Sequence, residues 1–168
     1  MAILVAFLVF IPLLMIQIGI LANLPLIQGY PDLILIAILA WSLRREVRTA
    51  WHWALIGALL VTWVSAMPFG VYLLAYTSVV GLALLVRRMV WRIPFLSMLV
   101  MTIIGTFVTD SISQLALQLS GRPFAIEYTF AAIFLPSVLY NLLFAIPIYA
   151  LIGELARWLY PLEPLYES

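Results

Sequence analysis

The chain lacks several of the side chains on which common site chemistries depend. It has 168 residues and no cysteine, which excludes disulfides, thiolate metal sites and a cysteine nucleophile. Its one histidine, His52, excludes a metal site built from several histidines. All eight basic residues are arginine, and a net charge of +1 gives no basis for nucleic-acid binding. The eight glycines are scattered, so no phosphate-cradling loop is present.

Charge of either sign is scarce, and apolar residues take its place. Charged residues make up 9% of the chain and hydrophobic residues 67%, against about 45–50% in soluble domains. Long runs contain no Asp, Glu, Lys or Arg: 1–31, 49–86, 93–109 and 128–153. A soluble monomer of this size keeps about a third of its surface in water, and this chain has too few polar residues to cover it. The composition predicts an all-α integral membrane protein.

The apolar runs predict six transmembrane helices that form a single domain. They cover residues 2–22, 31–43, 51–66, 71–86, 94–119 and 129–158. The first run has no basic start or cleavage site of a signal peptide, so we expect it to be retained. The second begins at Pro31 and Asp32, which favour a first helical turn, but has only about 12 apolar residues. This is short for a full crossing, so we expect the span to be tilted in the membrane, extended by residues 44–52, or partly shielded from lipid by neighbouring helices. Pro136 and Pro147 are expected to kink the last helix.

The arginines predict the orientation of the bundle. With six spans, seven of the eight fall on one side: Arg44, Arg45, Arg48, Arg87, Arg88, Arg92 and Arg157. The positive-inside rule makes that side cytoplasmic, together with both termini. We expect the clusters at 44–48 and 87–92 to contact anionic lipid head groups, with protein docking as the alternative. A five-span arrangement that merges residues 32–66 would place the two clusters on opposite sides.

The fifth predicted span carries a stripe of polar side chains. Thr102, Thr106, Asp110, Gln114 and Gln118 recur at intervals of four residues. Each step of four turns the direction by about 40°, so the side chains form one slowly winding line. Asp110 is the carboxylate deepest in a predicted span, and Asn141 in the last span is a candidate partner. The stripe lines an intramembrane polar cavity, or it supplies interhelical hydrogen bonds of about 0.6 kcal/mol each.

Catalysis finds little support in these residues. A serine mechanism needs a base beside the nucleophile, and His52 lies at the predicted membrane edge. An aspartyl mechanism needs two carboxylates that share a site, whereas the predicted spans offer one. We therefore expect a protein without enzymatic activity, cofactor or metal.

Three stretches and one acidic residue resemble the MreD family of bacterial rod-shape-determining membrane proteins. Residues 30–35, leading to Trp41, are similar to the start of that family's second span. A second stretch resembles the family's Ser-Gly-Ser-Pro-Leu-Gly-like turn into an aromatic helix, through Ser65, Pro68, Gly70, Tyr72 and Tyr76. Asp110 lies where many members carry an acidic residue, and residues 136–141 resemble the Asn-containing final span. The chain departs from the family at Thr62, where an Asp is common, and at Ala66 and Met67, where Gly and Ser are usual.

The resemblance implies a non-enzymatic scaffold of the cell-wall elongation machinery in the bacterial inner membrane. Such a protein binds the single-span protein MreC and, through it, connects MreB filaments with a RodA-type glycosyltransferase and a penicillin-binding transpeptidase. We expect the turn at residues 68–70, the two spans that it joins and the outer loop at 120–128 to make partner contacts.

A second interpretation is a substrate-binding subunit of an energy-coupling-factor vitamin transporter. Those subunits are compact bundles of six spans and similar size, which MreD resembles in layout. The fifth-span stripe would then line a substrate cavity open to the outer side. The short outer loops count against this interpretation, because they offer little to cover a ligand.

Overall fold

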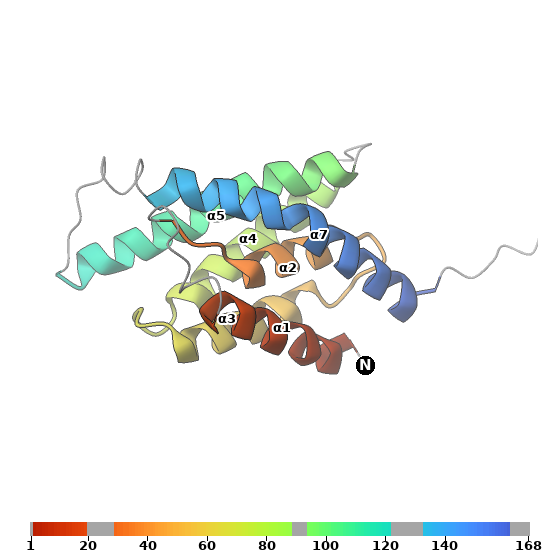
Figure 1. Ribbon diagram of the computed structural model, residues 1–168, viewed down its shortest axis with the longest axis horizontal. Helices are drawn as coiled ribbons and strands as arrows, with labels where there is room; N and C mark the ends of the chain where they lie inside the picture. Colours follow the sequence, from red (N-terminus) through yellow and green to blue (C-terminus); the bar gives the residue numbers. More distant parts are fainter. Residues whose placement is uncertain (1, 20–28, 89–93, 122–132, 162–168) are drawn as a thin grey trace, which may run out of the picture.

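The chain, seen in a computed structural model, forms a helical bundle. The structure describes residues 2–19, 29–88, 94–121 and 133–161 (Figure 1). The helices in these ranges are α1 (Ala2–Gly19), α2 (Leu33–Ser42), α3 (Ala50–Val64), α4 (Val71–Arg88), α5 (Pro94–Leu119) and α7 (Leu135–Leu159). The described ranges contain no strand. The prediction of an all-α chain is confirmed for this part of it.

Four of the helices are long and apolar enough to cross a membrane, namely α1, α4, α5 and α7. The surface of the bundle is correspondingly apolar, with exposed large side chains that include Leu8, Leu74, Phe107, Leu139 and Leu151. Polar side chains such as Thr106 and Asn141 are instead buried. Apolar groups outside and hydrogen-bonded polar groups inside are the arrangement that lipid requires. The described fold is that of a membrane protein.

The short helix α2 is the centre of the bundle. All ten of its residues are buried, and it contacts α1, α3, α4, α5 and α7. At 1.5 Å per residue it is about 15 Å long, about half the hydrocarbon thickness of a bilayer. Of the three explanations for the short second span, shielding by neighbouring helices is the one that the structure shows. Residues 43–49 separate α2 from α3, which excludes a merged helix over 32–66.

The predicted helix bounds agree closely with the structure where both can be compared. The bounds of α5 coincide with the prediction, and α4 extends two residues further, to Arg88. Residues 20–22 and 129–132 of the predicted spans lie outside the described ranges. Pro147 lies inside α7 as expected, but Pro136 lies in its first turn. A π-helical turn at residues 133–134 precedes it, so Pro136 lies where the helical geometry changes.

Residues 65–70 form the tight turn that connects α3 to α4. The backbone of Ser65, the C-cap of α3, is extended, and Gly70 has a φ of 94°. Glycine reaches this left-handed conformation without the steric cost of a Cβ atom. The turn predicted at residues 68–70 is present, and it leads directly into α4.

Candidate functional site

Asp32 begins α2 and is the centre of a buried polar cluster. Its Oδ1 accepts a hydrogen bond from the backbone N–H of Leu35 at 3.0 Å, which caps the helix. The hydroxyl of Tyr76, in α4, lies 2.9 and 2.8 Å from the two carboxylate oxygens of Asp32 and donates to them. Asp32 is 7% exposed and Tyr76 is fully buried. The hydroxyl thus ties the start of α2 to α4.

Asn141 completes this cluster from α7. Its Oδ1 accepts from the backbone N–H of Asp32 at 2.7 Å, and its Nδ2 donates to Thr106 Oγ1 at 2.8 Å. The two bonds fix the orientation of the amide, since one end must accept and the other must donate. Asp32, Tyr76, Thr106 and Asn141, hereafter the polar cluster, join α2, α4, α5 and α7 through buried hydrogen bonds.

The segment that leads into α2 is held by further contacts. The backbone N–H of Leu33 donates to Gln17 Oε1 of α1 at 2.9 Å, and that of Tyr30 donates to Ser137 Oγ of α7 at 3.3 Å. Gly29 lies against the start of α7 so closely that a Cβ atom there would be 2.6 Å from the backbone nitrogen of Ser137. The entry to α2 is therefore fixed on both sides.

A small cavity of about 10 Å³ adjoins the polar cluster. Its lining includes Asp32, Tyr72, Thr106, Asp110 and Asn141. Asp110 Oδ2 and the nearby Thr109 Oγ1 are buried and have no hydrogen-bond partner among the described residues. The volume corresponds to about one water molecule, far below the roughly 300–1,000 Å³ of a pocket for a small organic ligand.

The structure separates the members of the predicted polar stripe. Thr102 and Thr106 are buried, and their hydroxyls donate to carbonyls of their own helix, at Met98 and Thr102. Asp110 is half-buried and lines the cavity. Gln114 is half-buried, and Gln118 is exposed near the end of α5. Steps of about 40° explain this, because they carry the later side chains away from the interior face.

Sequence reasoning missed the pairing of Asp32 with Tyr76. It assigned Asp32 to the start of a helix and Tyr76 to a turn-and-helix motif, and both placements are correct. A signal was available, since an Asp directly before nine apolar residues must be buried if the helix is buried on all sides. Of the other motif residues, Tyr72 lies with its hydroxyl 3.5 Å from Ser65 Oγ, and Pro68 and Gly70 lie in the turn.

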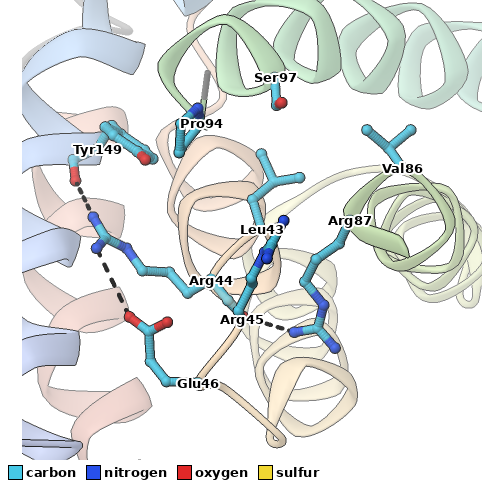
Figure 2. Close-up of a pocket in the computed structure, with 9 residues that line it drawn as sticks. All are labelled: Leu43, Arg44, Arg45, Glu46, Val86, Arg87, Pro94, Ser97 and Tyr149. Carbon is cyan, nitrogen blue, oxygen red and sulfur yellow. Dashed lines mark hydrogen bonds and ion pairs between the residues drawn. The ribbon is translucent and has the colours of Figure 1, made fainter. Parts of the chain in front are cut away.

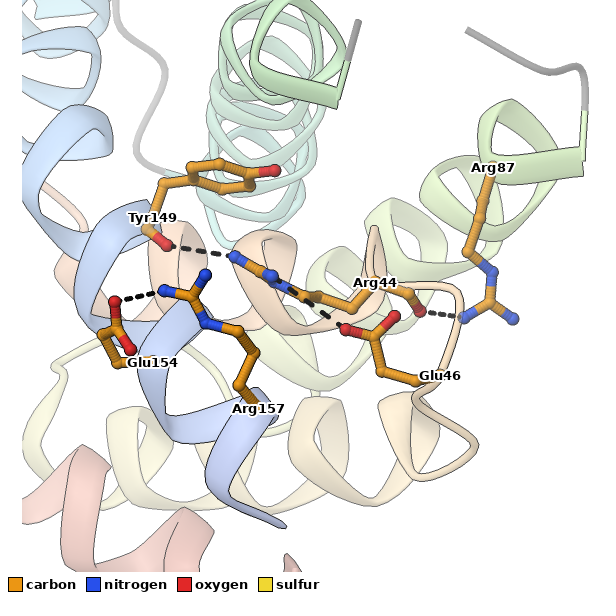
Figure 3. A network of polar contacts seen from close by, with 6 residues as sticks. All are labelled: Arg44, Glu46, Arg87, Tyr149, Glu154 and Arg157. Carbon is orange, nitrogen blue, oxygen red and sulfur yellow. Dashed lines mark hydrogen bonds and ion pairs between the residues drawn. The ribbon is translucent and has the colours of Figure 1, made fainter. Parts of the chain in front are cut away.

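Arginines gather at the opposite end of α2. One terminal nitrogen of Arg87, Nη1, donates to three backbone carbonyls: Ser42 at 3.4 Å, Arg44 at 2.7 Å and Val47 at 2.9 Å. The bond to Ser42 satisfies a carbonyl that the end of α2 leaves free, and the other two hold the segment that follows the helix. Figure 3 shows that Arg157, paired with Glu154, lies at this end as well. The clusters at 44–48 and 87–88 therefore share one end of the bundle.

A cavity of about 220 Å³ opens among these arginines (Figure 2). It is lined by Leu43, Arg44, Arg45, Glu46, Val86, Arg87, Pro94, Ser97 and Tyr149, hereafter the arginine pocket. Arg48 and Arg88 are exposed but do not line it, and Arg92 lies outside the described residues.

Asp32 and Asp110 both line the small cavity, so the structure brings two carboxylates to one site where the predicted spans offered one. Within the described ranges, no group of three or more His, Asp or Glu side chains is arranged to hold a metal ion. No protein-family model, curated protein or solved structure matches the chain. Its function must therefore be inferred from the polar cluster, the turn at 65–70 and the arginine pocket.

Proposed function

We propose that the chain is a non-enzymatic membrane scaffold of the bacterial cell-wall elongation machinery, as its resemblance to MreD implies. One observation carries the proposal. Stretches that resemble MreD and lie far apart in the sequence meet at the polar cluster, with Asp32 and Asn141 bonded across 109 residues. Tyr76, from the turn-and-helix stretch, bonds the same Asp32, and Asp110 lines the adjoining cavity. Any two apolar helices have a similar composition, so a resemblance between them is weak support for a shared family. A similar composition would not by itself place these polar residues next to one another.

The polar cluster suits a scaffold because it fixes the positions of four helices. Tyr76 lies in the second turn of α4, so its bond to Asp32 also fixes the start of that helix. The turn at 65–70 is thereby held against the central helix. Trp63, just before the turn, and Phe69, within it, are exposed by 86% and 83% and give it apolar area for a partner. We propose that this surface contacts a single-span, MreC-like protein.

The orientation proposed from the arginines agrees with this role. The arginine clusters lie at one end of the bundle, which the positive-inside rule makes cytoplasmic. A chain with six spans and both termini in the cytoplasm then presents the turn at 65–70 on the outer side of the inner membrane. Contacts with MreB filaments, the RodA-type glycosyltransferase and the penicillin-binding transpeptidase would pass through the MreC-like partner.

The size of the inner cavity favours a scaffold over a vitamin-binding subunit. A vitamin needs a pocket of several hundred Å³, and the cavity beside Asp110 measures about 10 Å³. Part of its lining is also engaged in joining helices, since the backbone N–H of Asp32 and Thr106 Oγ1 both bond to Asn141. Thermal-shift measurements with vitamins separate the two functions. A large stabilisation by one vitamin would contradict the scaffold proposal.

The direct test is co-purification with the MreC-like protein of the same organism from detergent-solubilised membranes. We expect the wild-type chain to recover this partner, and Gly70→Leu, Pro68→Ala and Phe69→Ala to reduce recovery. Gly81→Ala is the matched control, because a Cβ there meets its nearest neighbour at an ordinary 3.7 Å. Each variant is compared at equal amounts of folded protein. Unchanged recovery in all three variants would refute the assignment of the turn, and no recovery by the wild type would refute the scaffold.

A further inference from the structure

The arginine pocket has one charged wall and one apolar wall. Its charged wall comes from the segment after α2 and from the end of α4, and carries Arg44, Arg45 and Arg87. The apolar wall includes Val86 and Pro94, where α4 ends and α5 begins. Three arginines against the single carboxylate of Glu46 leave an excess of two positive charges on the lining. A ligand that satisfies both walls is an amphipathic anion.

Arg44 is held in place but retains an unused donor. Its Nη2 lies 3.5 Å from the carbonyl oxygen of Tyr149, its Nη1 lies 3.9 Å from Glu46 Oε1, and its Cζ is 5.0 Å from the centre of the Tyr149 ring. Its Nε is buried and has no hydrogen-bond partner among the described residues. A buried donor of a charged group is costly to leave unpaired, so the described residues do not fully satisfy the Arg44 guanidinium.

The other two arginines have donors to spare on the same pocket. Arg87 uses Nη1 for its three backbone carbonyls, and no hydrogen bond joins its remaining guanidinium nitrogens to a described residue. Arg45 is exposed and has no ion pair with a described residue. Figure 2 shows its side chain rising between those of Arg44 and Arg87. Guanidinium groups arranged in this way suit the several acceptor oxygens of a phosphate.

We propose that the arginine pocket binds the phosphate head group of an anionic phospholipid. The apolar wall argues for a lipid over a soluble phosphate, because exposed apolar side chains lie next to its residues in α4 and α5. There Leu82 and Leu85 of α4 and Phe95 of α5 are exposed and can receive an acyl chain. A volume of about 220 Å³ suits a phosphate and its neighbouring atoms, while the chains lie outside along the helices. Basic pockets between helices at the cytoplasmic face bind such head groups.

Binding of one lipid in the pocket and general attraction of the arginines to an anionic membrane predict different effects of substitution. Arg48 lies in the same loop as Arg45 and is also exposed, but it does not line the pocket. Arg45→Gln and Arg48→Gln change the net charge equally. The pocket predicts that only the first of them removes a hydrogen bond to the phosphate, whereas general attraction predicts equal effects.

The experiment is a titration of the purified chain in detergent, read by native mass spectrometry. We expect phosphatidylglycerol to bind at one site and more tightly than phosphatidylcholine. Arg45→Gln should weaken this binding about tenfold, as loss of a charge-assisted hydrogen bond does, and Arg48→Gln less than about twofold. Equal weakening by both variants, or equal binding of the two lipids, would overturn the proposal.

A second pair of variants tests the pocket without changing any charge. A Cβ atom on Gly153 would clash with Nη2 of Arg44, the mobile end of a long side chain. Gly153→Ala should therefore displace the guanidinium at little cost in stability and weaken phosphatidylglycerol binding at least threefold. Gly81→Ala should leave binding unchanged, because its added Cβ meets only an ordinary contact. Unchanged binding in Gly153→Ala would remove Arg44 from the site. Inorganic phosphate that binds as tightly as the lipid would refute the lipid assignment.

Discussion

Tyr76→Phe tests whether the polar cluster stabilises the fold. The variant removes one hydroxyl and keeps the ring, so it leaves the packing of Tyr76 against Tyr72 in place, with ring centres 5.7 Å apart. It deprives the Asp32 carboxylate of its only side-chain donor among the described residues. Asp32 keeps the bond from the Leu35 N–H, so the cap of α2 persists while its tie to α4 is lost.

The size of the effect follows from the burial of the acceptor. Hydrogen bonds between membrane helices average about 0.6 kcal/mol and reach about 1.7 kcal/mol, because the unfolded chain finds other partners in the membrane. A buried acceptor left without its donor costs about 1–3 kcal/mol. Asp32 is 7% exposed, and Tyr76 lies within hydrogen-bond distance of both its carboxylate oxygens. We therefore expect Tyr76→Phe to lower the free energy of unfolding by about 1.5 kcal/mol.

The assay is reversible unfolding in mixed micelles with increasing dodecyl sulfate, followed by the fluorescence of the six tryptophans. Tyr72→Phe is the matched control on the same helix, because its hydroxyl lies 3.5 Å from Ser65 Oγ and should contribute less than about 0.5 kcal/mol. Asp32→Asn combined with Tyr76→Phe should show a coupling energy of about 1 kcal/mol. An equal loss in Tyr72→Phe and Tyr76→Phe, or additive effects in the double variant, would refute the reasoning.

Three further predictions use the same unfolding assay. Gly29→Ala should destabilise by at least about 2 kcal/mol because its Cβ would meet the backbone at the start of α7, whereas Gly19→Ala, with open space around it, should be close to neutral. Gly70→Ala should lower the free energy of unfolding by about 1 kcal/mol, because the φ of 94° at this position strains a residue with a Cβ atom, and Gly70→Asn should lower it by less. If the wild type and both variants were equally stable, residue 70 would not be strained. Asn141→Leu removes both hydrogen bonds of the amide and should lower the free energy of unfolding by about 1–2 kcal/mol. A variant as stable as the wild type would contradict this prediction.

Much of the fold could be predicted because the local signals are strong. Pro94 begins α5 and Gly121, with a φ of 75°, follows its end, so the apolar run between them is bounded on both sides. Asp32 was predicted as a helix start, and its side chain does cap α2. The second span was recognised as short, and burial on all sides explains how a helix of ten residues fits within the bundle.

The candidate site could be predicted only in part because it depends on how the helices are aligned with one another. Asn141 was expected to bond the fifth span, and it does so through Thr106, one turn before Asp110; its bond to Asp32 was not predicted. A difference of one turn decides which polar residues meet, and apolar helices carry little information about that alignment. The pairing of Tyr76 with Asp32 spans 44 residues, so the sequence indicates the burial of Asp32 but not its partner.

The position of Pro136 shows the same limit. Its place within a long apolar run predicted a proline well inside a helix, but α7 begins at Leu135, directly after a π-helical turn at residues 133–134. Gly29 packs against Pro136 at this point, a contact that the sequence does not indicate.

The most direct measurement of the proposed function is the cell shape of the organism that carries this chain after its gene is deleted. A scaffold of the elongation machinery predicts that rod-shaped cells become round and that the wild-type chain restores the rod. Cells that keep their rod shape without the chain would contradict the account, and a vitamin requirement in the same cells would identify the transporter function instead.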